Sequence, residues 1–244
     1  MSAVERVDLH CHLLWGIDDG AQRPEDTLAM AKLLVGLGFR HVACSPHARP
    51  EFASRDAELC RRRLEEAKAL LAEHEIPLTL HSNAENLLDA ELLTKVERGA
   101  RTVGEGPYLL AEAPYLNRVP QLPEILFRLQ MAGYRLLVAH PERCREFEKV
   151  ERARDAVRAG AYLQLDLGSL TGQHGRTAKK LARAFLSEGL YAVAATDLHS
   201  PKDAAWLEDA IGELESRVGE AEATRLLATN PMAVLRGEQL AESR

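Results

Sequence analysis

An α/β fold built on parallel strands is the fold class that this sequence predicts. Seven short apolar segments with the character of strands alternate with longer segments of helical periodicity. This alternation is typical of a parallel sheet, and seven strands favour a distorted, TIM-like (β/α)7 barrel over an open, doubly wound sheet. Several strand-like segments end in His, Asp or Glu. Both architectures carry their active sites at the carboxyl ends of the strands, so we expect the active site there.

The first half of the chain contributes three of these strands and two helices. Pro24-Glu25-Asp26 marks the start of the first helix, because proline fits the first helical turn and carboxylates favour the positive end of the helix dipole. That helix ends near Gly36-Leu37-Gly38, and the next one is charged on one side and apolar on the other. We expect strands at residues 7–9, 41–44 and 77–81, and helices at 24–36 and 55–74.

The second half continues the alternation. We expect strands at residues 108–110, 135–139, 162–165 and 191–195, and helices at 120–132, 150–159, 178–188, 204–218 and 221–228. No internal repeat, low-complexity segment or linker interrupts the pattern. One compact domain over residues 1–244 is therefore the expectation.

The composition fits a soluble cytoplasmic enzyme. Hydrophobic residues make up 46% of the 244 positions, which is enough for a sizeable core. The net charge of −6 argues against a broad nucleic-acid-binding surface. No signal peptide and no membrane insertion are expected, because no segment approaches the ~20 apolar residues of a membrane helix. Cysteines at positions 11, 44, 60 and 144 form no CxxC pair, which favours reduced, structural thiols.

The most informative motif is Asp8-Leu9-His10-Cys11-His12, at the end of the first expected strand. Side chains two residues apart on a strand share a face, so His10 and His12 should point the same way and Cys11 the opposite way. Two imidazoles on one rigid face form half of a metal site, and Asp19 can reach back from the following turn as an oxygen donor. A His-x-His pair alone is weak support, because neutral histidines also occur in protein cores.

Other expected strands end in the same kinds of residue. Ser45-Pro46-His47 and Val138-Ala139-His140 end in histidine, and Leu110-Ala111-Glu112 ends in a carboxylate. Convergence of imidazoles and carboxylates at one edge of a sheet is hard to explain as packing, so we predict a catalytic metal site. Beyond the first motif, its candidate ligands are His47, Glu85, Glu112, His140, Asp197 and His199.

In their order and context these residues resemble the PHP (polymerase and histidinol phosphatase) superfamily of metal-dependent phosphoesterases. Within it they most resemble the bacterial protein-tyrosine phosphatases of capsule and exopolysaccharide operons. The resemblance runs from about Asp8 to Pro231 and implies a PHP-type metal-dependent phosphatase domain. Its sharpest matches are Asp18-Asp19-Gly20, Ala84-Glu85, His140-Pro141-Glu142-Arg143, Asp197-Leu198-His199 and Asn230-Pro231.

The resemblance implies three divalent metal ions. The first ion would be held by His10, His12, Glu85 and Asp197. Glu85 would bridge to the second ion, whose other ligands would be Glu112 and His140. The third ion would be held by Asp19, His47 and His199. Three dications and four carboxylates leave a charge of about +2, which matches a phosphate monoester dianion. Water on such ions is acidified and can attack phosphorus. The ligand set suits manganese, iron or zinc, of which we expect manganese.

Arg143 is the expected phosphate-binding residue, because a guanidinium group matches two phosphate oxygens. The alternative is a surface arginine in a basic stretch with Arg145. Arg49 is a second basic candidate, with solvent exposure as its alternative. Lys202 stands where relatives often have a second arginine, and a lysine orients phosphate less well. Catalysis is assigned to Arg143, Asp197 and His199.

Other conspicuous residues are interpreted as structural. The remaining histidines outside the motifs, His41, His74, His81 and His174, lack the context of ligands. Cys44 precedes Arg49 by five positions, whereas the Cys-x5-Arg phosphatase loop needs six, so thiol-phosphate catalysis is not expected and Cys44 should be a small buried side chain. Trp15 either forms a wall of the pocket or packs in the core.

Three functions remain open at this stage. A protein-tyrosine phosphatase of the resembling kind would act on an autophosphorylated bacterial tyrosine kinase with a disordered, tyrosine-rich tail, controlling polysaccharide export. A small-molecule phosphatase, acting for example on histidinol phosphate, would use the same metals in a narrower pocket. A non-catalytic PHP module would tend to lose ligands, whereas all nine are present here. The sequence is compatible with a homo-oligomer and does not reveal its oligomeric state.

Overall fold

Two parallel sheets form the centre of the protein in the computed structural model, which describes residues 4–97 and 101–241. The first sheet has the order β1 (Arg6–Cys11), β2 (Phe39–Cys44) and β3 (Thr79–Ser82). The second has the order β4 (Asn86–Leu87), β5 (Tyr108–Glu112), β6 (Arg135–Ala139), β7 (Tyr162–Asp166) and β8 (Tyr191–Ala195). Every neighbouring pair is parallel, which confirms the predicted α/β class with parallel strands.

The strand count differs from the expectation. All seven expected strands are present, but the described residues form eight, because the two-residue β4 follows β3. A strand this short shows no periodicity that could reveal it in the sequence. The third expected strand begins two residues later than predicted, after Pro77, which has no N–H group to donate to a neighbouring strand.

The two sheets approach each other at both edges through segments that follow or precede the strands. Cys11 at the end of β1 forms a parallel bridge with Leu198, and His47 forms one with Glu85. The His12 N–H donates to the Leu198 carbonyl at 2.9 Å, and the Asp197 N–H donates to the His10 carbonyl at 2.9 Å. These bridges bring the carboxyl ends of strands from both sheets to one place.

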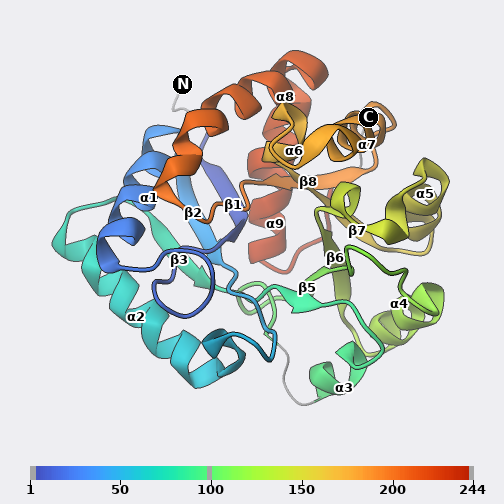
Figure 1. Cartoon of the computed structure of the whole chain (residues 1–244), viewed down its shortest axis with the longest axis horizontal. Coiled ribbons are helices and arrows are strands. Elements are labelled where there is room, and N and C mark those ends of the chain that lie inside the picture. Colours follow the sequence, from blue (N-terminus) through green and yellow to red (C-terminus); the bar gives the residue numbers. More distant parts are fainter. Residues whose placement is uncertain (1–3, 98–100, 242–244) are drawn as a thin grey trace.

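Helices surround the strands (Figure 1). Those of the first half, α1 and α2, flank β1–β3, and α4 and α5 lie on the opposite side of the molecule beside β5–β7. Asp56 caps α2 by accepting hydrogen bonds from the N–H groups of Glu58 and Leu59. The helices are α1 (Pro24–Gly36), α2 (Ala57–Glu73), α3 (Leu92–Glu97), α4 (Leu122–Met131), α5 (Val150–Arg158), α6 (Leu167–Thr171), α7 (Gly175–Ser187), α8 (Ala204–Thr224) and α9 (Asn230–Leu235).

The expected helices 204–218 and 221–228 are joined in the structure. Gly219 lies at the junction with a φ of 78°, a left-handed conformation that glycine adopts without strain, so α8 kinks there and continues to Thr224. A π-helical turn, Arg225–Thr229, then leads into α9. The shortest helices, α3, α6 and α9, were not predicted, because five or six residues are too few to show an amphipathic pattern.

The buried side chains form two clusters. The larger one joins the helices to the strands and includes Met30 and Leu34 of α1 and Leu64 of α2. The smaller one draws residues from both sheets, such as Leu9 and Leu137, together with Val234 of α9. Thus α9 packs against the strands between the two sheets (Figure 1). Within the described part of the chain, no helix is both long and apolar enough to cross a membrane.

Candidate metal centre

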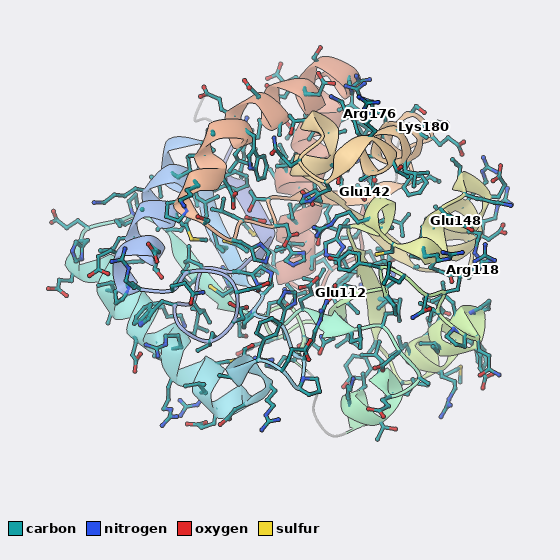
Figure 2. All side chains as sticks on the ribbon, viewed as in Figure 1. Glu112, Arg118, Glu142, Glu148, Arg176 and Lys180 are labelled. Atoms are coloured by element: carbon teal, nitrogen blue, oxygen red, sulfur yellow. The ribbon has the colours of Figure 1, made fainter. Side chains whose placement is uncertain are left out.

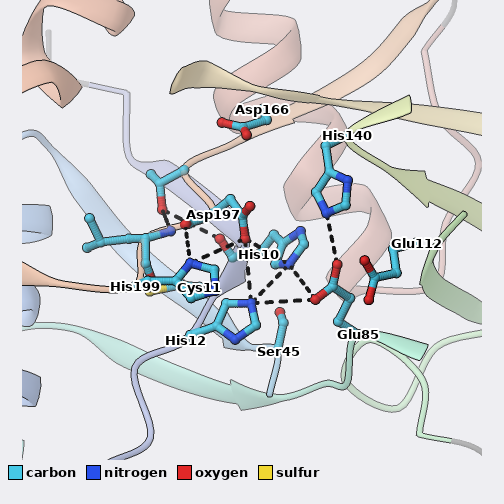
Figure 3. Close-up of polar contacts among 12 residues, drawn as sticks. His10, Cys11, His12, Ser45, Glu85, Glu112, His140, Asp166, Asp197 and His199 are labelled. Atoms are coloured by element: carbon cyan, nitrogen blue, oxygen red, sulfur yellow. Dashed lines mark hydrogen bonds and ion pairs between the residues drawn. The ribbon is translucent and has the colours of Figure 1, made fainter. Parts of the chain in front are cut away.

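All nine predicted ligand residues meet at the carboxyl ends of the strands. Figure 3 shows His10, His12, Glu85, Glu112, His140, Asp197 and His199 among them. They come from both sheets, and they form four overlapping groups in which the ligand atoms lie within 4.8 Å of one another. These groups are His12, Asp19, His47 and His199; His10, Glu85 and His140; His10, His12 and Asp197; and His47, Glu85 and Glu112.

His10 and His12 face each other, as their spacing on the strand predicts. Their Nε2 atoms are 3.2 Å apart, while the intervening Cys11 packs into the larger hydrophobic cluster. Asp197 reaches the same pair from beyond β8, with its Oδ1 atom 3.2 Å from His10 Nε2 and 3.5 Å from His12 Nε2. A carboxylate and two imidazoles therefore converge on one point.

The orientation of three histidines is fixed by hydrogen bonds from their Nδ1 atoms. His10 Nδ1 donates to Gln164 Oε1 at 3.1 Å, and His12 Nδ1 donates to the carboxylate of Asp18 at 2.9 Å. His199 Nδ1 donates to the Asp197 carbonyl at 2.7 Å. With Nδ1 engaged, the Nε2 atom of each ring is left to bind a metal, and such outer partners fix ring orientation in metal sites.

Glu85 lies at the middle of the cluster and is fully buried. His47 Nδ1 lies 2.6 Å and His140 Nε2 2.9 Å from its carboxylate oxygens, and His10 Nε2 is 3.5 Å away. Glu112 is also fully buried, and its carboxylate lies 3.6 Å from His47. A carboxylate with this many imidazole neighbours can bridge two cations.

A third group of ligands lies at the entrance to the cluster. Asp19 Oδ1 is 3.3 Å from His47 Nε2 and 3.7 Å from His199 Nε2. The His199 ring stacks on His12 with centroids 3.9 Å apart. The Asp19 side chain is 53% exposed, whereas Glu85 is fully buried, so the cluster extends from the surface inward.

Several buried polar atoms of this cluster have no hydrogen-bond partner among the described residues. His47 Nδ1 and Glu85 Oε2 are 2.6 Å apart, yet their geometry is not that of a hydrogen bond. Unpaired buried polar atoms are costly unless something binds them, and divalent cations would bind the imidazole and carboxylate atoms that face the cluster. The cluster atoms concerned are His47 Nδ1, Glu85 Oε2, Glu112 Oε2, His140 Nδ1 and Asp197 Oδ1.

The pKa values of His47 and Asp19 also indicate that the cluster attracts positive charge. Burial disfavours the charged His47 ring, but Asp19 and Glu85 outweigh burial and raise the pKa of His47 to about 9. The His47 ring in turn lowers the pKa of Asp19 to about 2. The carboxylates of the cluster thus attract positive charge, and bound cations would take over that role from the protons on the histidines.

Backbone strain is concentrated at two of the ligand residues. His140, directly after β6, has a φ of 32°, and Asp197, shortly after β8, has a φ of 51°. Left-handed conformations of such residues persist where the surroundings enforce them, often at functional sites. Gly20 is required for a different reason, because a Cβ atom there would lie 2.3 Å from the His12 carbonyl oxygen.

Arg143 lies at the border of the cluster, in a short 3-10 turn after His140. Its Nη1 atom donates to Asp197 at 2.6 Å and to Asp166 at 3.1 Å, and its Nη2 atom donates to the Tyr115 hydroxyl at 3.0 Å. Its guanidinium group also lies over the Tyr115 ring, 5.2 Å from the centroid. A cationic group next to a metal ligand is well placed to bind an anion.

Comparison with known proteins identifies the family. The family model described as capsular polysaccharide synthesis, CpsB/CapC, matches residues 6–236. The chain belongs to the CpsB/CapC family.

Two relatives and one solved structure extend this similarity. The tyrosine-protein phosphatase YwqE of Bacillus subtilis is 29% identical over 238 residues, covering 96% of this chain and 93% of YwqE. The tyrosine-protein phosphatase CpsB of Streptococcus pneumoniae is 24% identical over 237 residues, covering 94% of this chain and 98% of CpsB. A structure from work on YwqE and CpsB, described as unique metal-dependent tyrosine phosphatases, has a TM-score of 0.89 and 28% identity, with 97% of both chains covered. The predicted resemblance to capsule-associated phosphatases is confirmed.

The other two basic candidates of this CpsB/CapC-family chain differ in position. Arg49 is half-buried and forms an ion pair with Glu112, so it lies against the cluster. Lys202 is exposed and lines a surface hollow together with Asp19 and His199. It therefore lies near the entrance, without a contact to the buried ligands among the described residues.

Three further expectations for this CpsB/CapC-family chain concern structural residues. Trp15 is half-buried, packs against the larger cluster and carries Arg63 over its ring at 4.5 Å, so it does not line the site. Cys44 is buried, as expected, and burial raises its pKa far above the usual thiol range, which makes it a poor nucleophile. Of the four histidines interpreted as structural, His41 and His81 pair with each other at 3.1 Å, and His74 is exposed directly after α2.

The remaining one is His174, for which the structural interpretation stays a prediction. It lies beside Arg143, 2.6 Å from the carboxylate of Asp166. Sequence reasoning also missed Asp18, Gln164 and Asp166. Asp166 is the last residue of β7, so the strand-end rule that found the other carboxylates would have found it, had that strand been extended by one residue. Asp18 belongs to the Asp18-Asp19-Gly20 motif but was not named as a partner of a ligand, and nothing in the sequence pattern marks Gln164 or His174 as partners of the cluster.

Proposed function

We propose that this CpsB/CapC-family protein is a metal-dependent protein-tyrosine phosphatase acting on a bacterial tyrosine kinase or a related polysaccharide-synthesis protein. The observation that carries the proposal is the cluster of nine candidate ligand residues, most of them buried and several with orphaned polar atoms, directly beside Arg143. The named activity of YwqE and CpsB, which are similar over nearly their whole length, supports it.

Three divalent ions, with manganese expected and iron or zinc as alternatives, are part of this proposal. The overlap of the four ligand groups through His10, His12, His47 and Glu85 supports more than one ion. The first ion is assigned to His10, His12, Glu85 and Asp197, the second to Glu85, Glu112 and His140, and the third to Asp19, His47 and His199. Bound ions would neutralise the phosphate and acidify water for attack on phosphorus.

The residues of the chain itself bind and orient the substrate. The Arg143 guanidinium presents several N–H donors at the border of the metal centre and can hold two phosphate oxygens. Arg49, beside Glu112 on another side of the cluster, supplies a second positive charge. Together they oppose rotation of the phosphate while the ester bond to the leaving group is broken.

An aryl side chain fits the surroundings of Arg143. A cleft of about 390 Å³ is lined by Tyr115, Arg143 and His174 among others. Tyr115 stacks near His140 with centroids 5.8 Å apart, and Leu116 next to it is 80% exposed. Aromatic and aliphatic side chains at the rim favour contact with a phenyl ring.

Further features complete the proposal. A disordered tyrosine-rich kinase tail can enter a recessed site without refolding. Four free, buried cysteines suit a cytoplasmic location. The bridges between the two sheets suit a distorted barrel of PHP type formed by one domain over residues 1–244.

Removal of metal is expected to abolish activity. Chelation followed by desalting should reduce hydrolysis of an aryl phosphate to background, because no buried thiol or other nucleophile replaces activated water. Manganese added back should restore the rate, and the metal-free protein should melt at a lower temperature, because an ion that binds only the folded state stabilises it. The hydrolysis rate and the melting temperature are measured on samples whose metal content is determined by mass spectrometry. Full activity of a preparation shown to be metal-free would contradict the proposal.

Substrate preference tests the proposed function itself. We expect phosphotyrosine peptides of unrelated sequence to be hydrolysed at similar rates. Phosphoserine peptides should be hydrolysed at least about 100-fold more slowly, because the shorter side chain cannot bring phosphorus to the buried carboxylates. The measurement is kcat/KM for phosphotyrosine, phosphoserine and histidinol phosphate with each metal. Equal rates on both peptides indicate a broad phosphatase, and a strong preference for histidinol phosphate indicates a small-molecule enzyme.

A further inference from the structure

Asp166 is a buried carboxylate at the end of β7 that belongs to none of the four ligand groups. It accepts hydrogen bonds from Arg143 Nη1 at 3.1 Å and from the Gly168 N–H at 2.8 Å. Its Oδ2 atom also lies 2.6 Å from His174 Nε2. A fully buried carboxylate with three donors stays ionised and fixes the groups around it.

His174 connects this carboxylate to the cleft. It lies just before α7, and its side chain is 28% exposed and lines the cleft with Tyr115 and Arg143. Farther along α7, Arg176 and Lys180 extend to the outside of the molecule (Figure 2). Since Nε2 is held by Asp166, Nδ1 is the ring nitrogen left for a bound molecule. The Asp–His pair thus has the form of a positioned proton donor.

The wall of the cleft beside His174 is rigid. Glu142, labelled in Figure 2, is buried and accepts a hydrogen bond from the Tyr191 hydroxyl at 2.9 Å and another from the Asp166 N–H at 3.1 Å. On the other side, the loop that carries Tyr115 is held by an ion pair between Arg118 and Glu148 (Figure 2). Arg143 and His174 line the same cleft, so a phenyl ester bound between these walls would lie next to both side chains.

We propose that His174, oriented by Asp166, is the general acid that protonates the phenolic leaving group; this rests on the proposed tyrosine phosphatase function. Tyrosine is a poor leaving group as the phenolate, with a pKa of about 10, so a proton delivered as the ester bond breaks lowers the barrier. Asp166 contacts both His174 and Arg143. A phosphate bound by Arg143 would therefore lie near the proposed proton donor.

Hydrolysis of the phosphotyrosine ester by this route conserves atoms, protons and electrons. Water adds to phosphorus, the bond between phosphorus and the phenolic oxygen breaks, and the electron pair of that bond goes to the phenolic oxygen. The proton on His174 Nδ1 transfers to this oxygen and gives tyrosine. The attacking water releases one proton to solvent, and neutral His174 regains one from solvent, so the products are tyrosine and hydrogen phosphate.

The charges around His174 favour its protonated form. Burial opposes the charge, but Asp166 outweighs burial and raises the pKa of His174 above its ordinary value, with Asp197 acting in the same direction and Arg143 opposing. Glu142 also borders the cleft. A general acid must be protonated to act, so kcat/KM should fall as the pH rises through this raised pKa.

Leaving-group dependence tests the role. The variant His174→Gln is compared with wild type on a phosphotyrosine peptide and on 4-nitrophenyl phosphate, whose leaving group is a far weaker base. We expect kcat/KM to fall about 100-fold on the peptide and less than about 10-fold on the nitrophenyl ester, with loss of the alkaline limb of the pH profile. His74→Gln, a matched change at an exposed histidine directly after α2, should leave both rates unchanged.

The outcomes separate the possibilities. An equal fall on both esters would mean that His174 acts only by positioning Arg143 through Asp166, and an unchanged rate on both would mean that it has no role; either overturns the inference. Asp166→Asn should move the alkaline limb to lower pH, because the carboxylate that stabilises the imidazolium is gone. Failure of the wild-type protein to hydrolyse phosphotyrosine, despite activity on other monoesters, would contradict the proposed function and the inference that rests on it. Wild-type hydrolysis of phosphotyrosine together with an equal or absent effect of His174→Gln on the two esters would contradict the assignment of the acid alone.

Discussion

Glu85→Gln is expected to lose bound metal and to lower turnover of a phosphotyrosine peptide by about 1000-fold or more. Glu85 is fully buried and lies within 3.5 Å of His10, His47 and His140, so it is the residue shared by most of the cluster. The amide keeps the shape of the side chain but removes the negative charge that holds a dication. Without that ion, water near neutral pH remains a poor nucleophile, because its pKa is no longer lowered toward about 7.

Metal content and activity are measured on the same preparation of this variant. Glu208→Gln, the same change at an exposed position on α8, should have wild-type metal content and rate. Circular dichroism checks that both variants are folded. Wild-type metal content in Glu85→Gln would refute the bridging role, and wild-type turnover after metal loss would refute metal-assisted hydrolysis.

Arg143→Ala is expected to keep the metals and to lower kcat/KM about 100- to 1000-fold, the usual loss for one strong donor to a transition-state oxygen. The guanidinium group contacts Asp197 and Asp166, yet it is not a metal ligand, so its removal should leave the ions in place. Arg143→Lys should recover only part of the loss, because lysine keeps the charge and loses the planar, two-point geometry.

Arg145 supplies the matched control for this prediction. It lies two positions after Arg143 and is exposed. The two arginines belong to the basic stretch that was alternatively interpreted as a surface feature. Arg145→Ala should have a wild-type kcat/KM. If Arg143→Ala is kinetically silent, Arg49, which is paired with Glu112, becomes the better candidate for the phosphate-binding residue.

The strands and their ends could be predicted because they depend on local pattern. A run of apolar residues followed by His, Asp or Glu is visible in the sequence, and the alternation of side chains on a strand places His10 and His12 on one face. The short elements could not be predicted for the complementary reason. The two residues of β4 and the six residues of α9 adopt their structure because neighbouring strands hold them in place. Stabilisation by tertiary contacts produces no periodic pattern in the sequence.

The nine candidate ligand residues and Arg143 could thus be named from the sequence, because parallel strands must end at one edge of their sheet and so bring those residues together. Only the tertiary structure decided which nitrogen of the His10 ring faces the cluster, because Gln164, the partner that fixes this ring, lies 154 residues away along the chain. It also decided that His174, unremarkable in the sequence, lies against the buried Asp166. A hydrogen bond between distant segments depends on how the strands pack, and no spacing along one strand encodes it.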